Sequence, residues 1–140
     1  MIAIACDHGG YELKLQIIKY LEKEGLEYTD FGCNGESVDY PIYAQKVGRA
    51  IQNGECEKGI LICGTGIGIS IAANKMQGIR CALCSDCFSA EATRLHNNTN
   101  VVALGGRVIG PELAVKIVDT WLNTPFSNDE RHIRRIDMLE

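Results

Sequence analysis

The feature that most constrains the fold is the alternation of short apolar stretches with amphipathic ones along all 140 residues. Runs of four to six apolar residues are typical of buried strands, and helical spacing of apolar residues follows each of them. Such alternation predicts parallel strands with helices on both faces of one sheet. Because crossovers between parallel strands are right-handed, we expect a doubly wound, Rossmann-like α/β fold. The expected strands are residues 1–6, 28–31, 59–63, 80–84 and 101–104.

Helices are expected after each strand, with apolar residues three or four apart. A helix that starts at Pro111 should turn Leu113, Ile117 and Trp121 inward, and residues 128–140 should form one more, C-terminal helix. No linker rich in proline, glycine or serine divides the chain, and no internal repeat is present. We therefore expect residues 1–140 to form a single domain with one core.

Composition narrows the possible partners. The net charge of −4 gives the whole chain no attraction for polyanions, and the apolar runs are too short to cross a membrane. We therefore expect neither nucleic acid nor a membrane as a partner. There are seven cysteines, an odd number, and the first residues resemble a strand rather than a signal peptide. This pattern predicts reduced thiols and a cytoplasmic location.

Ligands of doubly wound sheets bind outside the carboxyl ends of the strands. This rule selects four segments as a candidate ligand edge. They are Asp7-His8, Cys63 to Gly66, Ser85-Asp86 and Gly105 to Arg107. Asp7 could simply cap the first helix, whereas His8 beside it is better placed to meet a ligand.

The strongest local motif is a buried strand that runs into three glycines at alternate positions, Gly64, Gly66 and Gly68. Glycines let the backbone approach a ligand, and the helix that follows adds positive charge at its N-terminus. The motif suits a phosphate or a developing oxyanion, although a tight turn without a ligand is the alternative. Ile69 replaces the third glycine of a dinucleotide fingerprint, but Asp86 keeps a nucleotide-binding alternative open.

The cysteines raise two further questions. Cys63 ends the strand before the glycine loop, where a thiolate could serve as a base or a nucleophile. A buried structural cysteine is an equally good interpretation. Cys81, Cys84 and Cys87 have the spacing of a metal site. We favour coincidence, because residues three apart on a strand point to opposite faces, and we expect no metal.

Two polar segments lie later in the chain. Residues 96–100 form a dense run, His-Asn-Asn-Thr-Asn, between a helix and a strand, and this run could be an ordinary loop. The tail gathers Arg131, His132, Arg134 and Arg135. Charge alone favours a solvated helix face over an anion site, with His132 as a solvated neighbour of the arginines.

Taken together, these segments resemble the type B ribose-5-phosphate isomerases and their relatives, including the galactose-6-phosphate isomerase subunits. The resemblance covers nearly the whole chain, and its specificity comes from the order and spacing of many short motifs. They are residues 6–10 (CDHGG), 39–41 (DYP), 59–70, 72–75 (AANK), 96–100 (HNNTN), 105–108 (GGRV) and 131–135 (RHIRR).

The resemblance implies interconversion of D-ribose 5-phosphate and D-ribulose 5-phosphate through an enediolate, with no metal or organic cofactor. By position, Cys63 is the base and His96 opens the furanose ring, and the site is shared between the two subunits of a homodimer. The oxyanion is held by the amides of Gly64, Thr65, Gly66, Ile67 and Gly68. Hydroxyls are bound by Asp7, Asn97 and Thr65, and phosphate by His8, Arg107, Arg131 and Arg135.

Two departures and two rivals accompany this expectation. Asn98 stands where many relatives carry aspartate, and Asp129-Glu130 precede Arg131, where their charge could weaken phosphate binding. The nearer rival keeps the chemistry on a hexose 6-phosphate such as allose or galactose 6-phosphate. The rival from another class is a non-catalytic nucleotide-binding module, which would bind an adenine nucleotide and turn over no sugar phosphate.

Overall fold

The computed structural model describes residues 1–140 and contains one sheet of five parallel strands. The strands are β1 (Ile2–Cys6), β2 (Tyr28–Asp30), β3 (Lys58–Cys63), β4 (Cys81–Leu83) and β5 (Val101–Gly105). They lie in the order β2-β1-β3-β5-β4. The chain therefore moves outward from β1 to β2 and then continues on the other side of β1 with β3. That reversal puts a topological switch point between β1 and β3, where such folds form their ligand crevice.

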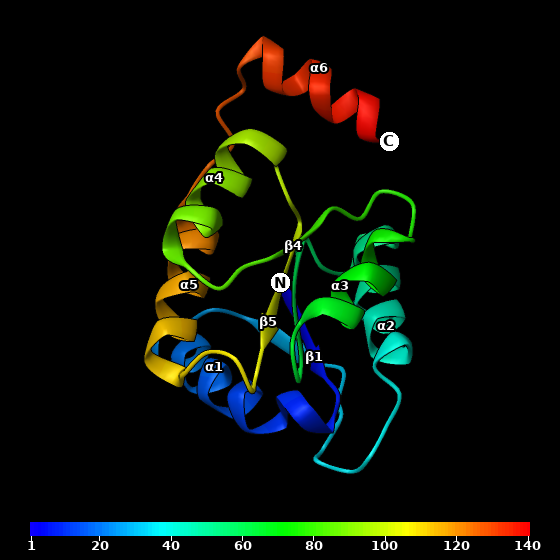
Figure 1. Cartoon of the computed structure of the whole chain (residues 1–140), viewed down its shortest axis with the longest axis vertical. Helices are drawn as coiled ribbons and strands as arrows, with labels where there is room; N and C mark the ends of the chain where they lie inside the picture. Colours follow the sequence, from blue (N-terminus) through cyan, green and yellow to red (C-terminus); the bar gives the residue numbers. More distant parts are fainter.

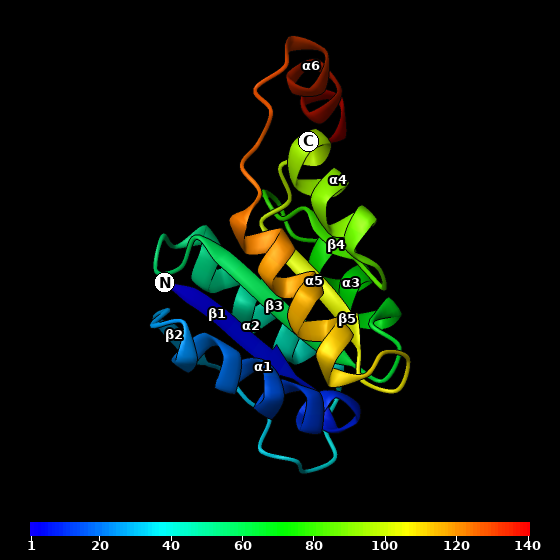
Figure 2. The ribbon, with the colours of Figure 1, turned by 90° about the vertical axis from the view of Figure 1, so that its left-hand side faces the viewer.

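Helices cover both faces of the sheet, as the sequence predicted (Figure 1). On one face α1 (Tyr11–Lys23), α4 (Cys87–Asn97) and α5 (Pro111–Asn123) pack together, and on the other α2 (Tyr40–Gln52) packs against α3 (Ile67–Asn74). A short 3₁₀ turn, η1 (His8–Gly10), joins β1 to α1. The last helix, α6 (Glu130–Leu139), lies beyond the end of α4, away from the sheet (Figure 2). The prediction of a doubly wound sheet with a C-terminal helix is confirmed.

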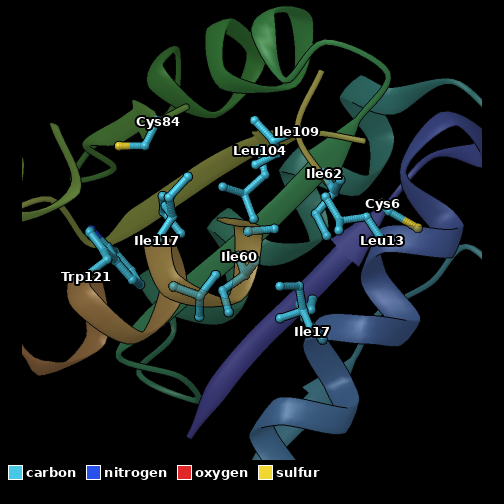
Figure 3. Packing of buried hydrophobic residues seen from close by; sticks show 14 of the residues in the cluster. Cys6, Leu13, Ile17, Ile60, Ile62, Cys84, Leu104, Ile109, Ile117 and Trp121 are labelled. Carbon is cyan, nitrogen blue, oxygen red and sulfur yellow. The ribbon is translucent and has the colours of Figure 1, made fainter. Parts of the chain in front are cut away.

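Two hydrophobic cores, one on each side of the sheet, follow from the inward faces of these helices. Figure 3 shows the larger one, which includes Leu13 and Ile17 of α1, Ile60 of β3 and Trp121 of α5. The smaller core joins the other face of the sheet to α2 and α3. Each strand in the centre of the sheet is thus buried on both sides, which explains why its sequence is continuously apolar.

The inward face of α5 was predicted only in part. Ile117 and Trp121 are fully buried, as expected, but Leu113 is 39% exposed. The buried stripe instead starts at Ala114 and continues through Ile117, Val118 and Trp121. Residues 114, 117, 118 and 121 have the spacing of one helical face, so Leu113 lies at its edge.

No helix in the structure has the combination of length and apolar character needed to cross a membrane.

Candidate functional site

The carboxyl ends of β1, β3 and β5 lie side by side and carry the first group of predicted site residues. Asp7 directly follows β1, and its side chain caps the η1 turn. Its Oδ1 atom accepts hydrogen bonds from the amides of Gly9 at 2.9 Å and Gly10 at 3.2 Å. The carboxylate is thereby fixed in one orientation. Asp7 is also largely buried, with 7% of its surface exposed. The capping role considered from sequence is therefore real, and it leaves Oδ2 available to a hydroxyl.

Glycines allow the three loops at this edge to touch through their main chains. A β carbon on Gly9 would lie 2.9 Å from the amide nitrogen of Gly64. One on Gly10 would lie 2.5 Å from the carbonyl oxygen of Ile62, and one on Gly106 would lie 2.5 Å from that of Gly9. Any side chain at these positions would force the loops apart, because real β carbons do not approach backbone so closely. The edge therefore has a rigid floor made of backbone.

Cys63 is the last residue of β3 and is 4% exposed. Its Sγ atom accepts a hydrogen bond from the amide of Gly66 at 3.1 Å, which orients the sulfur within the loop. Gly66 itself precedes α3 with φ of +78°, a left-handed conformation that favours glycine. The hydroxyl of Thr65 accepts a hydrogen bond from the amide of Ile67, the first residue of α3, at 3.2 Å.

Three amides of the glycine loop, those of Gly64, Thr65 and Gly68, find no acceptor within the chain. Together with the N-terminus of α3, they provide donors for an anion. Gly68 also has a packing reason to be glycine, since a β carbon there would come within 2.4 Å of the Tyr40 ring. The loop thus combines the anion-binding features predicted from sequence with steric demands that sequence could not show.

Two basic side chains flank this loop. The amide of Arg107 donates to the carbonyl of Gly64 at 2.9 Å, and its guanidinium group extends over Gly64. Arg107 is exposed and takes part in no ion pair of the chain, so its charge is free for a ligand. His8 is also exposed, and its Nδ1 atom accepts from the amide of Val38 at 3.4 Å. Both suit the recognition of a phosphate group.

The second group of predicted residues lies where α4 ends. A hollow of about 410 Å³ there combines the exposed end of α4 with the basic side of α6. Asn97 is held in place because its Oδ1 atom accepts from the hydroxyl of Thr93 at 3.1 Å. Asp129 caps α6 and lies 3.6 Å from the Nε atom of Arg131, so the two are loosely paired. The predicted residues that line the hollow are His96, Asn97, Arg131 and Arg135.

His132 was expected to be a solvated neighbour of the arginines, and that expectation is wrong. The residue is only 8% exposed, its ring packs on that of His96 at 4.6 Å between centroids, and Ser127 Oγ lies 2.7 Å from its Nδ1 atom. Burial, assisted by His96 and the neighbouring arginines, lowers the pKa of His132. The signal for burial was available, because His132 and Ile136 are four residues apart on the apolar face of the last helix.

The two groups do not meet within one chain. Parallel strands run in one direction and their helices return in the other, so α4 starts at the carboxyl edge and ends at the amino edge. Cys63 lies at the carboxyl edge, whereas His96 lies at the amino edge beside the start of β5. A strand of five residues such as β5 spans about 16 Å. Figures 1 and 2 agree, with α6 and the end of α4 far from α1.

The cysteine run at residues 81–87 does not form a metal centre. No group of three or more histidine, cysteine, aspartate or glutamate side chains in the structure could hold a metal ion. Cys84 is buried in the larger core, and this burial raises its pKa to about 11. Burial also raises the pKa of Cys81 well above its usual value. Cys84 is therefore a core side chain, and Cys81 is partly buried against the smaller core.

Fold and geometry together define a doubly wound protein with a glycine loop of unpaired amides at its switch point and a second basic group on the opposite edge. The sequence model of the Ribose/Galactose Isomerase family matches residues 2–139. The chain belongs to that family, and it is an enzyme of the aldose–ketose isomerase class.

Individual relatives agree with this assignment. Ribose-5-phosphate isomerase B of Escherichia coli is 50% identical, over 99% of this chain and 93% of that protein. D-erythrulose-4-phosphate isomerase of Pectobacterium atrosepticum is 48% identical, over 89% of this chain and 84% of that protein. The solved structure of ribose-5-phosphate isomerase B from Clostridium thermocellum superposes with a TM-score of 0.96 at 52% identity, over 99% of this chain and 93% of that one. Membership of an isomerase family decides against the non-catalytic nucleotide-binding module.

Proposed function

We propose that the enzyme interconverts D-ribose 5-phosphate and D-ribulose 5-phosphate. The observation that carries the proposal is the arrangement at the carboxyl edge, where the Cys63 thiol lies beside three amides that have no acceptor and a guanidinium that has no carboxylate. This is the equipment needed to form an enediolate and to hold the phosphate of the same molecule. Similarity to an enzyme named for ribose 5-phosphate supports this choice of substrate.

The chemistry follows from the positions of these groups. Cys63 as thiolate removes the proton from C2 of the open-chain aldose, and the electron pair forms the C1–C2 double bond while O1 becomes negative. The amides of Gly64, Thr65 and Gly68 stabilise that oxyanion. The thiol then returns the proton to C1, and the proton on O2 moves to O1, which leaves a ketone at C2. No cofactor takes part in this sequence.

His96 would act before these steps, by giving a proton to the ring oxygen of the furanose. Since His96 and Cys63 lie on opposite edges of the sheet, we propose that each site joins the carboxyl edge of one subunit to the end of α4 and α6 of a second copy. Ribose 5-phosphate would then meet Asp7, Asn97 and Thr65 at its hydroxyls. Its phosphate would meet His8 and Arg107 from one chain and Arg131 and Arg135 from the other.

The substrate and the thiols together favour a reducing location. Sugar phosphates are intracellular intermediates, and all seven cysteines of the chain are free. We propose that the enzyme works in the cytoplasm.

The test is a comparison of three substrates under the same conditions: ribose 5-phosphate, allose 6-phosphate and erythrose 4-phosphate. The third is included because a relative at 48% identity is named for the corresponding four-carbon ketose. We expect kcat/KM to be highest with ribose 5-phosphate. A higher value with allose 6-phosphate would instead identify a hexose phosphate isomerase. Turnover of none of the three would contradict the proposed function.

A further inference from the structure

Arg80 is not one of the predicted site residues, but its side chain contacts the segments that carry several of them. It directly precedes β4 at the amino edge, and its amide donates to Oδ1 of Asn100 at 2.9 Å. Each of the three nitrogens of its guanidinium group has a partner. Nε donates to the carbonyl of Asn97 at 3.0 Å, Nη2 donates to that of Asn98 at 2.9 Å, and Nη1 pairs with the carboxylate of Glu140.

These partners belong to the two segments that make the second half of the site. Asn97 and Asn98 end α4 directly after His96, and Glu140 follows α6, which carries Arg131 and Arg135. We propose that Arg80 is a positioning residue, which holds the His96 turn and α6 in a fixed relative orientation. The inference rests on the proposed function, because it assumes that His96 and the two arginines act on one substrate.

If Arg80 only capped the C-terminus of α4, its ion pair with Glu140 would not be needed. Arg94 already donates from Nη1 to Oδ1 of Asn98 at 2.9 Å and to the carbonyl of Thr99 at 2.6 Å, and from Nε to the carbonyl of Thr124 at 3.1 Å. Arg94 thus secures the chain that leads into α6, and Arg80 secures the far end. A helix of ten residues is about 15 Å long, so attachments near both of its ends limit its pivoting more than either one would alone.

The packing of the two histidine rings gives a direct reporter of this orientation. His96 lies in the last turn of α4 and His132 lies in α6, and the centroids of their rings are 4.6 Å apart. The chain has only three histidines, so the imidazole signals in an NMR spectrum can be assigned by single substitutions. The proposed site brings His8 close to α6 of a second copy, so the methyl signals of Ile17, which is fully buried in the larger core, serve as the internal control.

The experiment compares Arg80→Met, Glu140→Gln and Glu57→Gln with wild type. Glu57 forms a comparable exposed ion pair with the N-terminus, away from the site, and is the matched control. In Arg80→Met we expect the His96 and His132 signals to move toward those of free imidazole while the Ile17 methyl signals stay in place. Titration with inorganic phosphate, followed on the same signals, should give a Kd raised by about tenfold, because a displaced α6 would weaken the charged hydrogen bonds of Arg131 and Arg135 to the phosphate. Glu140→Gln should raise that Kd by no more than about fivefold, as for an exposed ion pair.

Unchanged His96 and His132 signals in Arg80→Met, with a phosphate Kd within twofold of wild type, would overturn the proposal. If the Ile17 methyl signals move as well, Arg80 supports the whole fold, which also contradicts a positioning role. Should Arg80→Met fail to fold, Glu140→Gln and Arg80→Lys answer the same question, and rescue by lysine of the fold but not of the signals would support the proposal. Neither readout requires turnover, so the result is separate from the outcome of the substrate assays.

Discussion

Refolding two inactive variants together tests whether the site is shared between subunits. Cys63→Ala removes the proposed base, and His96→Ala removes the proposed ring-opening acid. The two residues lie at opposite edges of a sheet whose strand β5 spans about 16 Å. No rotation of a side chain closes such a gap. If both residues serve one site, Cys63 of one chain must therefore act with His96 of a second chain.

The expected recovery follows from two-fold symmetry. A mixed dimer has one site that carries both defects and one site that carries neither. Random pairing makes half of the dimers mixed, and half of the sites in those dimers work, so activity should return to roughly a quarter of wild type. A mixed dimer isolated with two different affinity tags should reach roughly half of wild type.

The assay is the conversion of ribose 5-phosphate by the refolded mixture and by the isolated mixed dimer, with each variant refolded alone as the control. Either variant alone should stay inactive, because both of its sites lack the same group. A mixed dimer that is isolated intact and remains inactive would refute the shared site. It would mean that Cys63 and His96 do not act together across the interface.

Three further outcomes are expected. Cys63→Ala should lower kcat by about 10²–10⁴-fold with binding of substrate retained, and a kcat above a tenth of wild type would remove Cys63 from the role of base. Arg131→Ala and Arg135→Ala should each weaken binding of phosphorylated sugars by about 1.5–3 kcal/mol but barely affect free sugars, as compared by KM. Lys14→Met should lower the free energy of unfolding by about 2–4 kcal/mol in urea titrations, because fully buried Lys14 binds Asp30 and the carbonyl of Cys33.

Much of the fold could be predicted because local sequence patterns determine where its helices and strands lie. Buried strands such as β3 and β5 are continuously apolar, and glycines or prolines mark where helices such as α5 begin. The position of β5 between β3 and β4 was not predicted, since strand order depends on which edges pair after the chain has collapsed. The exposure of Leu113 was not predicted either, because the packing partners of a helix decide which of two adjacent faces is buried.

The candidate site divides along the same line. Asp7, Cys63 and Arg107 were predictable because they lie at or just after the ends of strands, and strand ends are visible in sequence. His96 entered only through the resemblance to a family, since an ordinary loop explained the same residues. The roles of Arg80 and His132 were missed, because Arg80 contacts residues up to 60 positions away, and the burial of His132 depends on where α6 lies.

The backbone floor between Gly9, Gly64 and Gly106 has a consequence for how such enzymes diverge. Main-chain atoms are common to all residues, so substitutions around the pocket leave the floor and its amide donors in place. Under the proposed function, substrate length can then change through the surrounding side chains while the proposed step at C1 and C2 keeps its amide donors. Relatives named for a five-carbon and for a four-carbon sugar phosphate, each about half identical to this chain, are the kind of pair that a floor of main-chain atoms would permit.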